Sequence, residues 1–321
     1  MTTCASTPNT APDALPVAVG VIRRGDRVLL ARRPAHVHQG GLWEFPGGKR
    51  EPGEDRRSAL IRELDEELGI RAEHLRPLIR LRHAYPERTV ELDVWQVDRW
   101  RGEPHGREGQ PLRWVAVADL HTLPLPAANR PIVTAVRLPS RYLITGPFAD
   151  AADFRRRLQA ALAQGIRLVQ FRAHHLDAGE YLVLAREAVA LCHAAGARLL
   201  INGPPDWVAA TGADGVHLTR HRLLSLTSRP LPANRLVAAS THDAQELRQA
   251  QAVGVDFSVL SPVAPTASHP GVRPLGWRGF AELVRLAAHP VYALGGLGEA
   301  ERERAWEAGG QGVAAIRAWW P

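Results

Sequence analysis

The alternation of apolar and polar positions divides the chain into two parts. From residue 16 to 138, apolar runs with strand-like spacing surround one strongly helical segment, which is typical of a mixed α/β domain. The expected strands are residues 17–22, 27–31, 90–97 and 113–117, and the expected helix is 56–68. The rhythm changes after the short segment 138–140. We therefore predict two domains, 16–138 and 139–321, after a disordered lead-in over residues 1–15 that is rich in Thr, Ala and Pro.

The second part alternates short apolar runs with helical ones. The expected strands are residues 142–145, 168–172, 198–202, 215–218, 236–240, 257–262, 291–294 and 312–316. The expected helices between them are residues 151–164, 181–194, 207–211, 244–253, 279–287 and 299–308. Eight strands separated mainly by helices predict a (β/α)8 TIM-type barrel. Few residues remain after 316 for an eighth helix, so closure of the barrel is the weakest part of this prediction.

Composition limits the class of protein. With 321 residues, 45% of them hydrophobic, the chain is long enough for two domains with their own cores. No apolar run approaches the roughly 20 residues of a membrane span, and the first residues lack a signal-peptide pattern. Cys4 and Cys192 lie far apart in the sequence, which excludes a disulfide framework and a thiol metal cluster. We expect a cytoplasmic protein without membrane contact.

The net charge of +7 is carried by basic residues spread over both parts of the chain. Because they form no patch in the sequence, we expect no direct nucleic-acid binding and favour a small anionic substrate. Lys49 is the only lysine and directly follows Gly48, where a compact ammonium group could reach a phosphate oxygen. The alternative is an accident of composition.

The strongest candidate chemistry is an acidic helix face in residues 48–70, GKREPGEDRRSALIRELDEELGI. Glu63, Glu66 and Glu67 stand at positions i, i+3 and i+4, so their like charges share one face of the expected helix. Hard divalent cations are bound through carboxylate oxygens, so Mg2+ is the expected cofactor and Mn2+ the alternative. A merely solvated acidic face is the other interpretation. A glycine turn before the helix and Gly69 after it favour the cation site.

This segment resembles the Nudix signature at each of its defined positions. These are Gly48, Glu54, Arg62, Glu63, Leu64, Glu66, Glu67, Gly69 and Ile70. The flanking segments ARRPAHVHQGGLWEFPGGK, YPERTVEL, WRGEPHGREGQP and LPAANRPIV are similar to the MutT class of 8-oxo-dGTP diphosphatases. The resemblance implies an α/β/α sandwich with a mixed sheet. It also implies Mg2+-dependent hydrolysis of 8-oxo-dGTP, with dGTP as a related nucleotide, to the monophosphate and pyrophosphate, an activity that protects DNA replication from mutation.

The resemblance also assigns roles to residues. The implied metal ligands are Gly47, Glu63, Glu66, Glu67 and Glu108, and the four glutamates are the implied catalytic residues. The implied bracing residues of the loop and helix are Gly48, Glu54 and Arg62. The implied nucleotide contacts are Arg33, His38, Phe45, Arg88 and Asn129, to which Lys49 is added.

Asn129 matches the residue that reads the base. An amide offers both a donor and an acceptor, and oxidation at C8 of guanine turns the N7 acceptor into a donor. Ordinary roles stay open for three residues. Asn129 would sit in a turn beside Pro131, His38 would be a loop histidine, and Phe45 would belong to the core.

The second part resembles the thiamine-phosphate synthase and TenI family from residue 141 to about 318. The matching segments are RYLITG, LVQFRAHH, RLLINGPPD, GADGVHL, ASTHDAQEL, DFSVLSPVAPTASHPGVRPLG and VYALGG. Where the family carries two lysines and two aspartates for diphosphate and Mg2+, this chain has His174, Gly203, Arg222 and His269. Because both carboxylates are missing, we expect no synthase activity. The remaining ligand candidates are Arg172, Asn202, Ser240, His242, Thr266, Gly295 and Gly296.

Several functions remain open from the sequence. The barrel would hold a phosphorylated, thiamine-related ligand, as a thiazole tautomerase using His242, as a sensing or non-catalytic module, or with another activity. The first domain would act on 8-oxo-dGTP, or on a damaged thiamine diphosphate as the barrel suggests. A third interpretation makes the barrel a binding module that regulates the hydrolase. The oligomeric state is not indicated.

Overall fold

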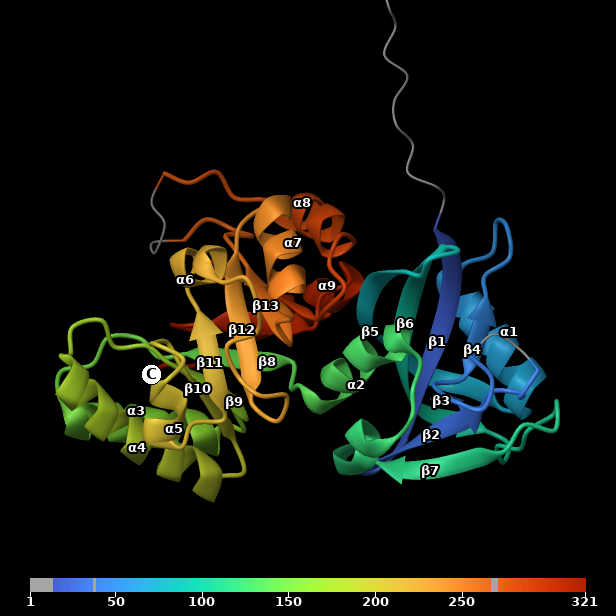
Figure 1. Cartoon of the computed structure of the whole chain (residues 1–321), viewed down its shortest axis with the longest axis horizontal. Helices are drawn as coiled ribbons and strands as arrows, with labels where there is room; N and C mark the ends of the chain where they lie inside the picture. Colours follow the sequence, from blue (N-terminus) through green and yellow to red (C-terminus); the bar gives the residue numbers. More distant parts are fainter. Residues whose placement is uncertain (1–13, 37–38, 267–270) are drawn as a thin grey trace, which may run out of the picture.

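The computed structural model describes residues 14–36, 39–266 and 271–321. Two units follow each other along the chain and lie side by side, a sheet flanked by helices and a barrel (Figure 1). The last helix of the first unit ends at Arg137, and the first barrel strand begins at Arg141. The boundaries 1–15, 16–138 and 139–321 stay predictions. Within the described residues, no helix combines the length and apolar character that crossing a bilayer requires.

The first unit is built on a mixed sheet with the strand order β3-β2-β1-β6-β5, in which β4 pairs with β1 and β7 with β2. Only β1 and β6 run parallel; the other pairs are antiparallel. The strands are β1 Leu15–Arg24, β2 Arg27–Arg32, β3 Trp43–Glu44, β4 Gly47–Lys49, β5 Arg71–Ala84, β6 Thr89–Arg101 and β7 Leu112–Ala116. The helices are α1 Arg56–Leu68 and α2 Arg130–Arg137, with short 3-10 turns at Val117–Thr122 and Ala127–Asn129. One helix covers each face of the sheet, which confirms the predicted α/β/α sandwich.

Helix α1 confirms the helix predicted over residues 56–68. The Asp55 carboxylate caps its first turn by accepting from the Ser58 N–H at 3.0 Å. Gly69 ends the helix in the left-handed region at φ 67°. Leu60, Leu64 and their neighbours one turn apart are fully buried against the sheet, so the opposite face carries the acidic side chains.

The second unit is a closed barrel of eight parallel strands in the order β8 to β15, so the doubt about its closure was wrong. The strands are β8 Arg141–Ile144, β9 Leu168–Phe171, β10 Arg198–Ile201, β11 Gly215–Leu218, β12 Leu236–Thr241, β13 Phe257–Leu260, β14 Val291–Leu294 and β15 Gly312–Ala315. The helices are α3 Ala151–Ala163, α4 Ala178–Ala194, α5 Trp207–Thr211, α6 Arg220–Ser225, α7 Ala244–Val253, α8 Gly276–Val284 and α9 Arg302–Glu307, with a 3-10 turn at Glu299–Glu301. Among the described residues no helix follows β15, yet β15 pairs with β8 and completes the barrel.

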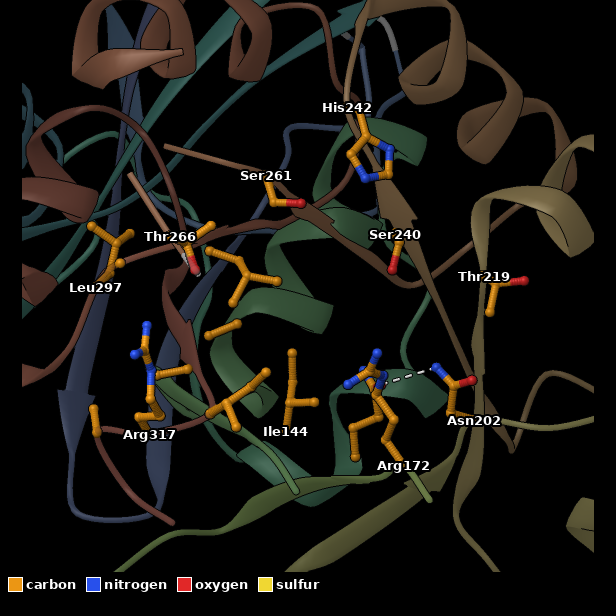
Figure 2. Close-up of a pocket in the computed structure, with 18 of the residues that line it drawn as sticks. Ile144, Arg172, Asn202, Thr219, Ser240, His242, Ser261, Thr266, Leu297 and Arg317 are labelled. Atoms are coloured by element: carbon orange, nitrogen blue, oxygen red, sulfur yellow. Dashed lines mark hydrogen bonds between the residues drawn. The ribbon is translucent and has the colours of Figure 1, made fainter. Parts of the chain in front are cut away.

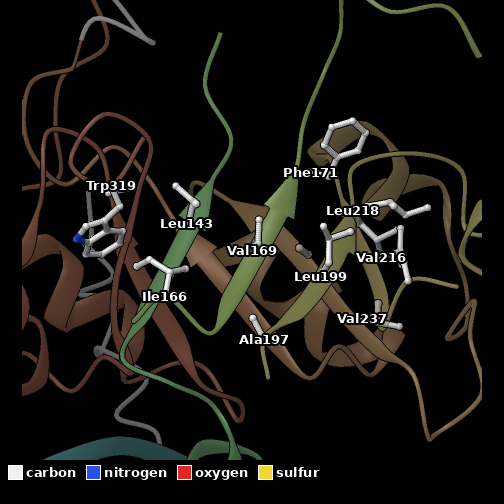
Figure 3. Packing of buried hydrophobic residues seen from close by; sticks show 14 of the residues in the cluster. Leu143, Ile166, Val169, Phe171, Ala197, Leu199, Val216, Leu218, Val237 and Trp319 are labelled. Atoms are coloured by element: carbon white, nitrogen blue, oxygen red, sulfur yellow. The ribbon is translucent and has the colours of Figure 1, made fainter. Parts of the chain in front are cut away.

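Alternation along each barrel strand separates two cores. In β8, Leu143 points outward to the layer between strands and helices, whereas Tyr142 and Ile144 belong to the barrel interior. Figure 3 shows outward side chains such as Val169 and Leu199 packed in this outer layer. The outer layer is apolar, whereas the barrel interior combines apolar side chains with buried polar ones such as Gln170 and His217. Polar residues at the carboxyl ends of the strands line the barrel mouth above them.

Candidate active site

Gly47 and Gly48, which begin the short strand β4 and are called the glycine turn below, lie directly against the acidic face of α1. Gly47 adopts φ 138°, and a Cβ there would stand 2.1 Å from the Ala18 carbonyl oxygen. A Cβ on Gly48 would stand 2.1 Å from a carboxylate oxygen of Glu63. Only glycine permits this close approach, which sets the turn beside the carboxylates.

Glu67 is the carboxylate most strongly affected by this packing. It accepts a hydrogen bond from the Gly47 N–H at 3.1 Å. Burial, and then the nearby charges of Glu44, Glu63 and Glu108, raise the pKa of Glu67 to about 8, although the Gly47 hydrogen bond opposes the shift. Burial is also the main reason for the raised pKa of Glu63. The site therefore disfavours the charged form of these carboxylates, and a bound cation would stabilise that form.

Arg62 lies among the carboxylates of Glu54, Glu63 and Glu66 and contacts all three. Its guanidinium donates to both oxygens of Glu54 at 3.0 Å, and to Glu63 and Glu66 at 3.0 and 2.9 Å. A further N–H of Arg62 donates to the Lys49 carbonyl at 3.0 Å. The bond from Arg62 lowers the pKa of Glu54. This arrangement holds the glycine turn, the loop before α1 and the helix together.

Glu108 reaches the site on a loop fastened to the end of α1. The Arg107 N–H donates to the Glu67 carbonyl at 3.0 Å, and the Gln110 side chain donates to the same carbonyl at 3.0 Å. The Gln110 amide oxygen in turn accepts from the Glu108 N–H at 2.9 Å. The Glu108 side chain is exposed, and its negative charge contributes to the raised pKa of Glu67.

The donor set fits a hard divalent cation by its chemistry. It consists of carboxylate oxygens around the buried carboxyl of Glu67, whose pKa is raised first by burial and then by like charges. Among the described residues, however, no three His, Cys, Asp or Glu side chains lie close enough together to hold a metal ion. Arg62 instead engages Glu63 and Glu66, whose side chains are 14% and 59% exposed. The carboxylates are thus neighbours, with Glu66 turned toward solvent.

A cavity of about 240 Å3 opens beside the glycine turn. It brings together the predicted residues Arg33, Phe45, Gly47, Gly48, Lys49, Arg88 and Asn129. The Asn129 carbonyl oxygen accepts from the Phe45 N–H at 3.1 Å, which fixes the amide at the cavity wall. Phe45 is also part of the buried core. His38 lies outside the described residues.

Two residues of this cavity were missed by the sequence analysis. Glu44 forms an ion pair with Arg33, and burial raises the pKa of Glu44 although Arg33 opposes the shift. Tyr85 also lines the cavity, at a turn where the Tyr85 N–H donates to the Arg88 carbonyl at 2.8 Å. The only signal for Glu44 was its position in the short segment between the matched residues Arg33 and Phe45, and for Tyr85 its position beside Arg88.

The barrel mouth contains a second cavity, of about 520 Å3, lined by all seven candidate residues. They are Arg172, Asn202, Ser240, His242, Thr266, Gly295 and Gly296, and His174 lines the cavity with them (Figure 2). Gly203 and Arg222 are absent from this lining, and His269 lies outside the described residues. The Nδ1–H of His242 donates to the buried Glu246 carboxylate at 2.8 Å.

A buried chain of hydrogen bonds runs below this cavity. The Asn202 amide donates to the Gln170 oxygen at 3.0 Å, and the Gln170 amide donates to the Tyr142 hydroxyl at 3.4 Å. Tyr142 contacts His217 Nδ1 at 3.0 Å, and His217 Nε2 contacts the Ser240 hydroxyl at 2.9 Å. Asn202 and Ser240 are thereby fixed at the two ends of one network.

The fold and the site thus define a two-domain protein, a Nudix-type domain followed by a (β/α)8 barrel. A family model for the NUDIX domain matches residues 18–135, and one for thiamine monophosphate synthase matches residues 141–319. The chain belongs to both families, with a MutT-like Nudix domain and a thiamine-phosphate synthase-like barrel.

Individual relatives match one domain each. The 8-oxo-dGTP diphosphatase of Escherichia coli is 40% identical over 124 residues, which are 38% of this chain and 96% of that protein. The CTP pyrophosphohydrolase of Escherichia coli is 40% identical over 119 residues, 37% of this chain and 88% of that protein. A thiamine-phosphate synthase of Synechococcus is 37% identical over 177 residues, 55% of this chain and 49% of that protein.

Proposed function

We propose that the Nudix domain hydrolyses 8-oxo-dGTP to 8-oxo-dGMP and pyrophosphate with Mg2+, and so removes an oxidised nucleotide. One observation carries this proposal: the cavity that contains Asn129 also includes the turn whose Gly47 N–H donates to Glu67. A base held at Asn129 and a phosphate chain at the carboxylates would therefore lie in one continuous site. The similarity to the 8-oxo-dGTP diphosphatase over 96% of its length supports the same substrate.

Each residue of the proposed site has a separate role in the reaction. Glu63, Glu66, Glu67 and Glu108, with the Gly47 carbonyl, are the proposed cation ligands. When bound there, Mg2+ supplies positive charge to the phosphate oxygens and lowers the pKa of water. Water then attacks the β-phosphorus, its proton passes to a carboxylate, for which we propose Glu108, and the bond to the α-phosphate oxygen breaks. Lys49, at the same turn, is placed to neutralise a phosphate oxygen.

Asn129 is the proposed reader of the base. Its carbonyl oxygen already accepts one hydrogen bond, from Phe45, and has capacity for a second. Within the described residues its NH2 group donates to no side chain or carbonyl. An amide in this state can donate to O6 of 8-oxoguanine and accept from its N7–H, whereas N7 of guanine offers no proton.

The test compares initial rates for 8-oxo-dGTP, dGTP, CTP and thiamine diphosphate with Mg2+. We expect the highest kcat/KM for 8-oxo-dGTP. Glu67→Gln should lose nearly all turnover, and Asn129→Ala should reduce the preference for 8-oxo-dGTP over dGTP by about tenfold, the effect of losing one buried pairing. Glu282→Gln and Asn234→Ala are matched controls on exposed parts of the barrel.

Two results would contradict the proposal. An intact enzyme that hydrolyses dGTP as well as 8-oxo-dGTP has no sanitising specificity. A higher kcat/KM for CTP, the substrate in the name of one relative, or for thiamine diphosphate would assign the site to that compound instead.

For the barrel we propose a role in binding a phosphorylated, thiamine-related ligand. A second candidate, TenI-like thiazole tautomerisation, is favoured by the contact of His242 with the buried Glu246, because a carboxylate orients an imidazole for proton transfer. Proton exchange of a thiazole phosphate, followed by NMR in deuterated water, should be lost in His242→Gln. Equal exchange by the variant would exclude this role.

A further inference from the structure

The cavity at the barrel mouth has an unbalanced charge. Among its described lining residues, Arg172, Arg220 and Arg317 are cationic, and none is Asp or Glu. Arg220 is neutralised at the rim by the buried carboxylate of Glu246. Within the described residues, the guanidinium groups of Arg172 and Arg317 take part in no ion pair and no hydrogen bond, and Arg172 contacts Thr145 only through its backbone. In the part of the chain that the structure describes, two fixed positive charges therefore face the cavity without a counter-charge.

The two guanidinium groups enter the cavity from different elements. Arg172 follows β9 and Arg317 follows β15, and Figure 2 shows their side chains on either side of Ile144. Ile144 lies between them in this view, and the lining of the cavity also includes the apolar residues Ile316 and Leu297. A ligand that fills this space meets cations at two sides and an apolar surface between them.

The electrostatic environment around Arg172 extends to further basic groups. Burial is the main reason for the lowered pKa of His174, and the positive charges of Arg172, Arg222 and His175 lower it further. These basic groups therefore act together on this side of the cavity. Such a field repels a divalent cation and attracts an anion. The carboxylates that would hold Mg2+ here are absent from the cavity lining.

The other side of the cavity offers backbone donors. Gly296 adopts φ 66°, and a Cβ there would stand 2.4 Å from the Pro265 carbonyl, so the turn requires glycine. Its N–H donates to no described residue. Backbone N–H groups in such a turn, next to an arginine, bind phosphate oxygens.

An unsatisfied acceptor adds an independent observation. The Asn202 carbonyl oxygen is buried and has no hydrogen-bond partner among the described residues, whereas its NH2 is held by Gln170 at 3.0 Å. A buried acceptor without a donor destabilises the protein until a ligand or water supplies one. Asn202 lines the same cavity as Arg172. The ligand should therefore carry an N–H or O–H donor besides its anionic group.

We propose that the barrel mouth binds a phosphorylated small molecule without a divalent cation, using Arg172 and Arg317 as its two counter-charges. This inference goes beyond the hydrolase activity and rests on the binding role proposed for the barrel. It adds that arginine side chains, and no metal ion, hold the phosphate. Its outcome is independent of the Nudix substrate, because the deciding titrations, including those of the arginine variants, are made in EDTA, where the Nudix reaction has no Mg2+.

The test is isothermal titration calorimetry of the full chain with inorganic pyrophosphate and with phenyl phosphate, in EDTA and in excess Mg2+. We expect both probes to bind in EDTA, and Mg2+ to leave the affinity unchanged or weaker. Arg172→Ala and Arg317→Ala should each weaken binding of at least one probe about tenfold, the loss expected for a charged hydrogen bond. Arg278→Ala, at a 93% exposed side chain on α8, is the matched control and should bind as the intact protein does.

Several outcomes would overturn the inference. They are binding that requires Mg2+, binding that persists unchanged in both arginine variants, and a lack of binding by either probe in EDTA. Circular dichroism of each variant checks its fold, and Arg172→Gln and Arg317→Gln replace any alanine variant that unfolds. Retained affinity in the glutamine variants would equally contradict a counter-charge role.

Discussion

Arg62 shows how one side chain organises the glycine turn and the acidic helix face. It satisfies Glu54 with two parallel hydrogen bonds and at the same time contacts Glu63 and the Lys49 carbonyl. Paired contacts of this kind are the strong geometry of arginine and carboxylate, because both groups are planar and match. With a side chain only 27% exposed, Arg62 acts as a positioning residue for the neighbouring carboxylates.

Replacing Arg62 by alanine should therefore reduce both activity and stability. We expect Arg62→Ala to lower kcat by more than about tenfold and the free energy of unfolding by about 1–3 kcal/mol, as charged hydrogen bonds contribute. Steady-state kinetics and urea unfolding measure the two effects. Arg57→Ala, on an exposed position of the same helix, should change neither. If kcat were unchanged in Arg62→Ala, the positioning role would be excluded.

His217 gives the barrel a defined sensitivity to acid. Burial lowers the pKa of His217 to about 3, against 6.5 for a free histidine. Its folded-state pKa is depressed, so the unfolded chain takes up a proton first, and stability is lost as pH falls below 6.5. The expected loss is about 2 kcal/mol at pH 5 relative to neutral pH.

Urea unfolding between pH 5 and 7 measures this dependence. His217→Gln, which cannot titrate, should show a flatter slope of stability against pH, even if it is less stable throughout. The exposed His121→Gln should retain the slope of the intact protein. An equal slope in His217→Gln would show that the acid sensitivity arises elsewhere, for which the buried His289, with a pKa lowered to about 4, is the alternative.

At the scale of elements, the contact between the glycine turn and α1 is the feature to test. Gly48 has no positive φ, so only the 2.1 Å distance from its Cβ position to Glu63 opposes a larger side chain. Because the obstacle is the end of a flexible carboxylate, Gly48→Ala should displace Glu63 at little cost in stability. We expect kcat/KM to fall about tenfold or more, since a small misplacement of a reacting group is costly.

Gly53→Ala is the control for backbone strain. Gly53 has φ 79° and open space around its Cβ position, so alanine there should lower the melting temperature with little effect on kcat/KM. Thermal melts and kinetics on both variants separate the two effects. Normal kcat/KM in Gly48→Ala would mean that the position of Glu63 is not critical.

The same scale shows what could be predicted from the sequence. Helix α1 and strands such as β11 and β14 were predicted at their observed bounds, because their apolar spacing and caps are local signals. Strand β5 was missed because its charged residues and Pro77 hide the alternation. It lies at the sheet edge, and its register shifts at three places. Its stability depends on β6 and on the barrel, which are distant in sequence.

Only those site residues that belong to a recognisable sequence motif could be predicted. The residues around Gly48 and Arg62 could be chosen from one continuous segment, whereas Glu44 and Arg317 gain their importance from neighbours that the fold supplies. The partial engagement of Glu66 by Arg62 likewise depends on rotamers that a sequence does not specify.

At the scale of the whole molecule, the barrel covers β5, the strand at one edge of the Nudix sheet. The Arg80 N–H donates to the Gly309 carbonyl at 3.1 Å, and the Arg82 N–H donates to the Ala287 carbonyl at 3.4 Å. The Arg76 guanidinium lies over the Trp306 ring at 4.6 Å (Figure 1 shows β5 facing α9). An uncovered edge strand exposes its backbone donors to other chains, so this contact protects the Nudix domain as well as joining it to the barrel.

Gln311 provides the sharpest test of this coupling. It is 1% exposed, and its amide donates to the carbonyls of Ala135 and Leu138 at 3.0 and 3.1 Å, across the domain boundary. Gln311→Ala would deprive the buried Leu138 carbonyl of its Gln311 partner, whereas the Ala135 carbonyl would keep the Leu138 N–H at 3.3 Å. We expect a cost of about 1–3 kcal/mol. We expect the intact protein to unfold in one calorimetric transition and Gln311→Ala to show two, with the Nudix transition at lower temperature.

Gln249→Ala removes a similar pair of contacts inside the barrel, because the Gln249 amide donates to the carbonyls of Leu223 and Leu226 at 3.3 and 2.7 Å. It should weaken the barrel without separating the domains, so a single transition at lower temperature is expected. Two transitions in the intact protein would show that the domains unfold independently. A single unshifted transition in Gln311→Ala would show that the two bonds of Gln311 do not couple them, and the β5 contacts would then be the ones to remove.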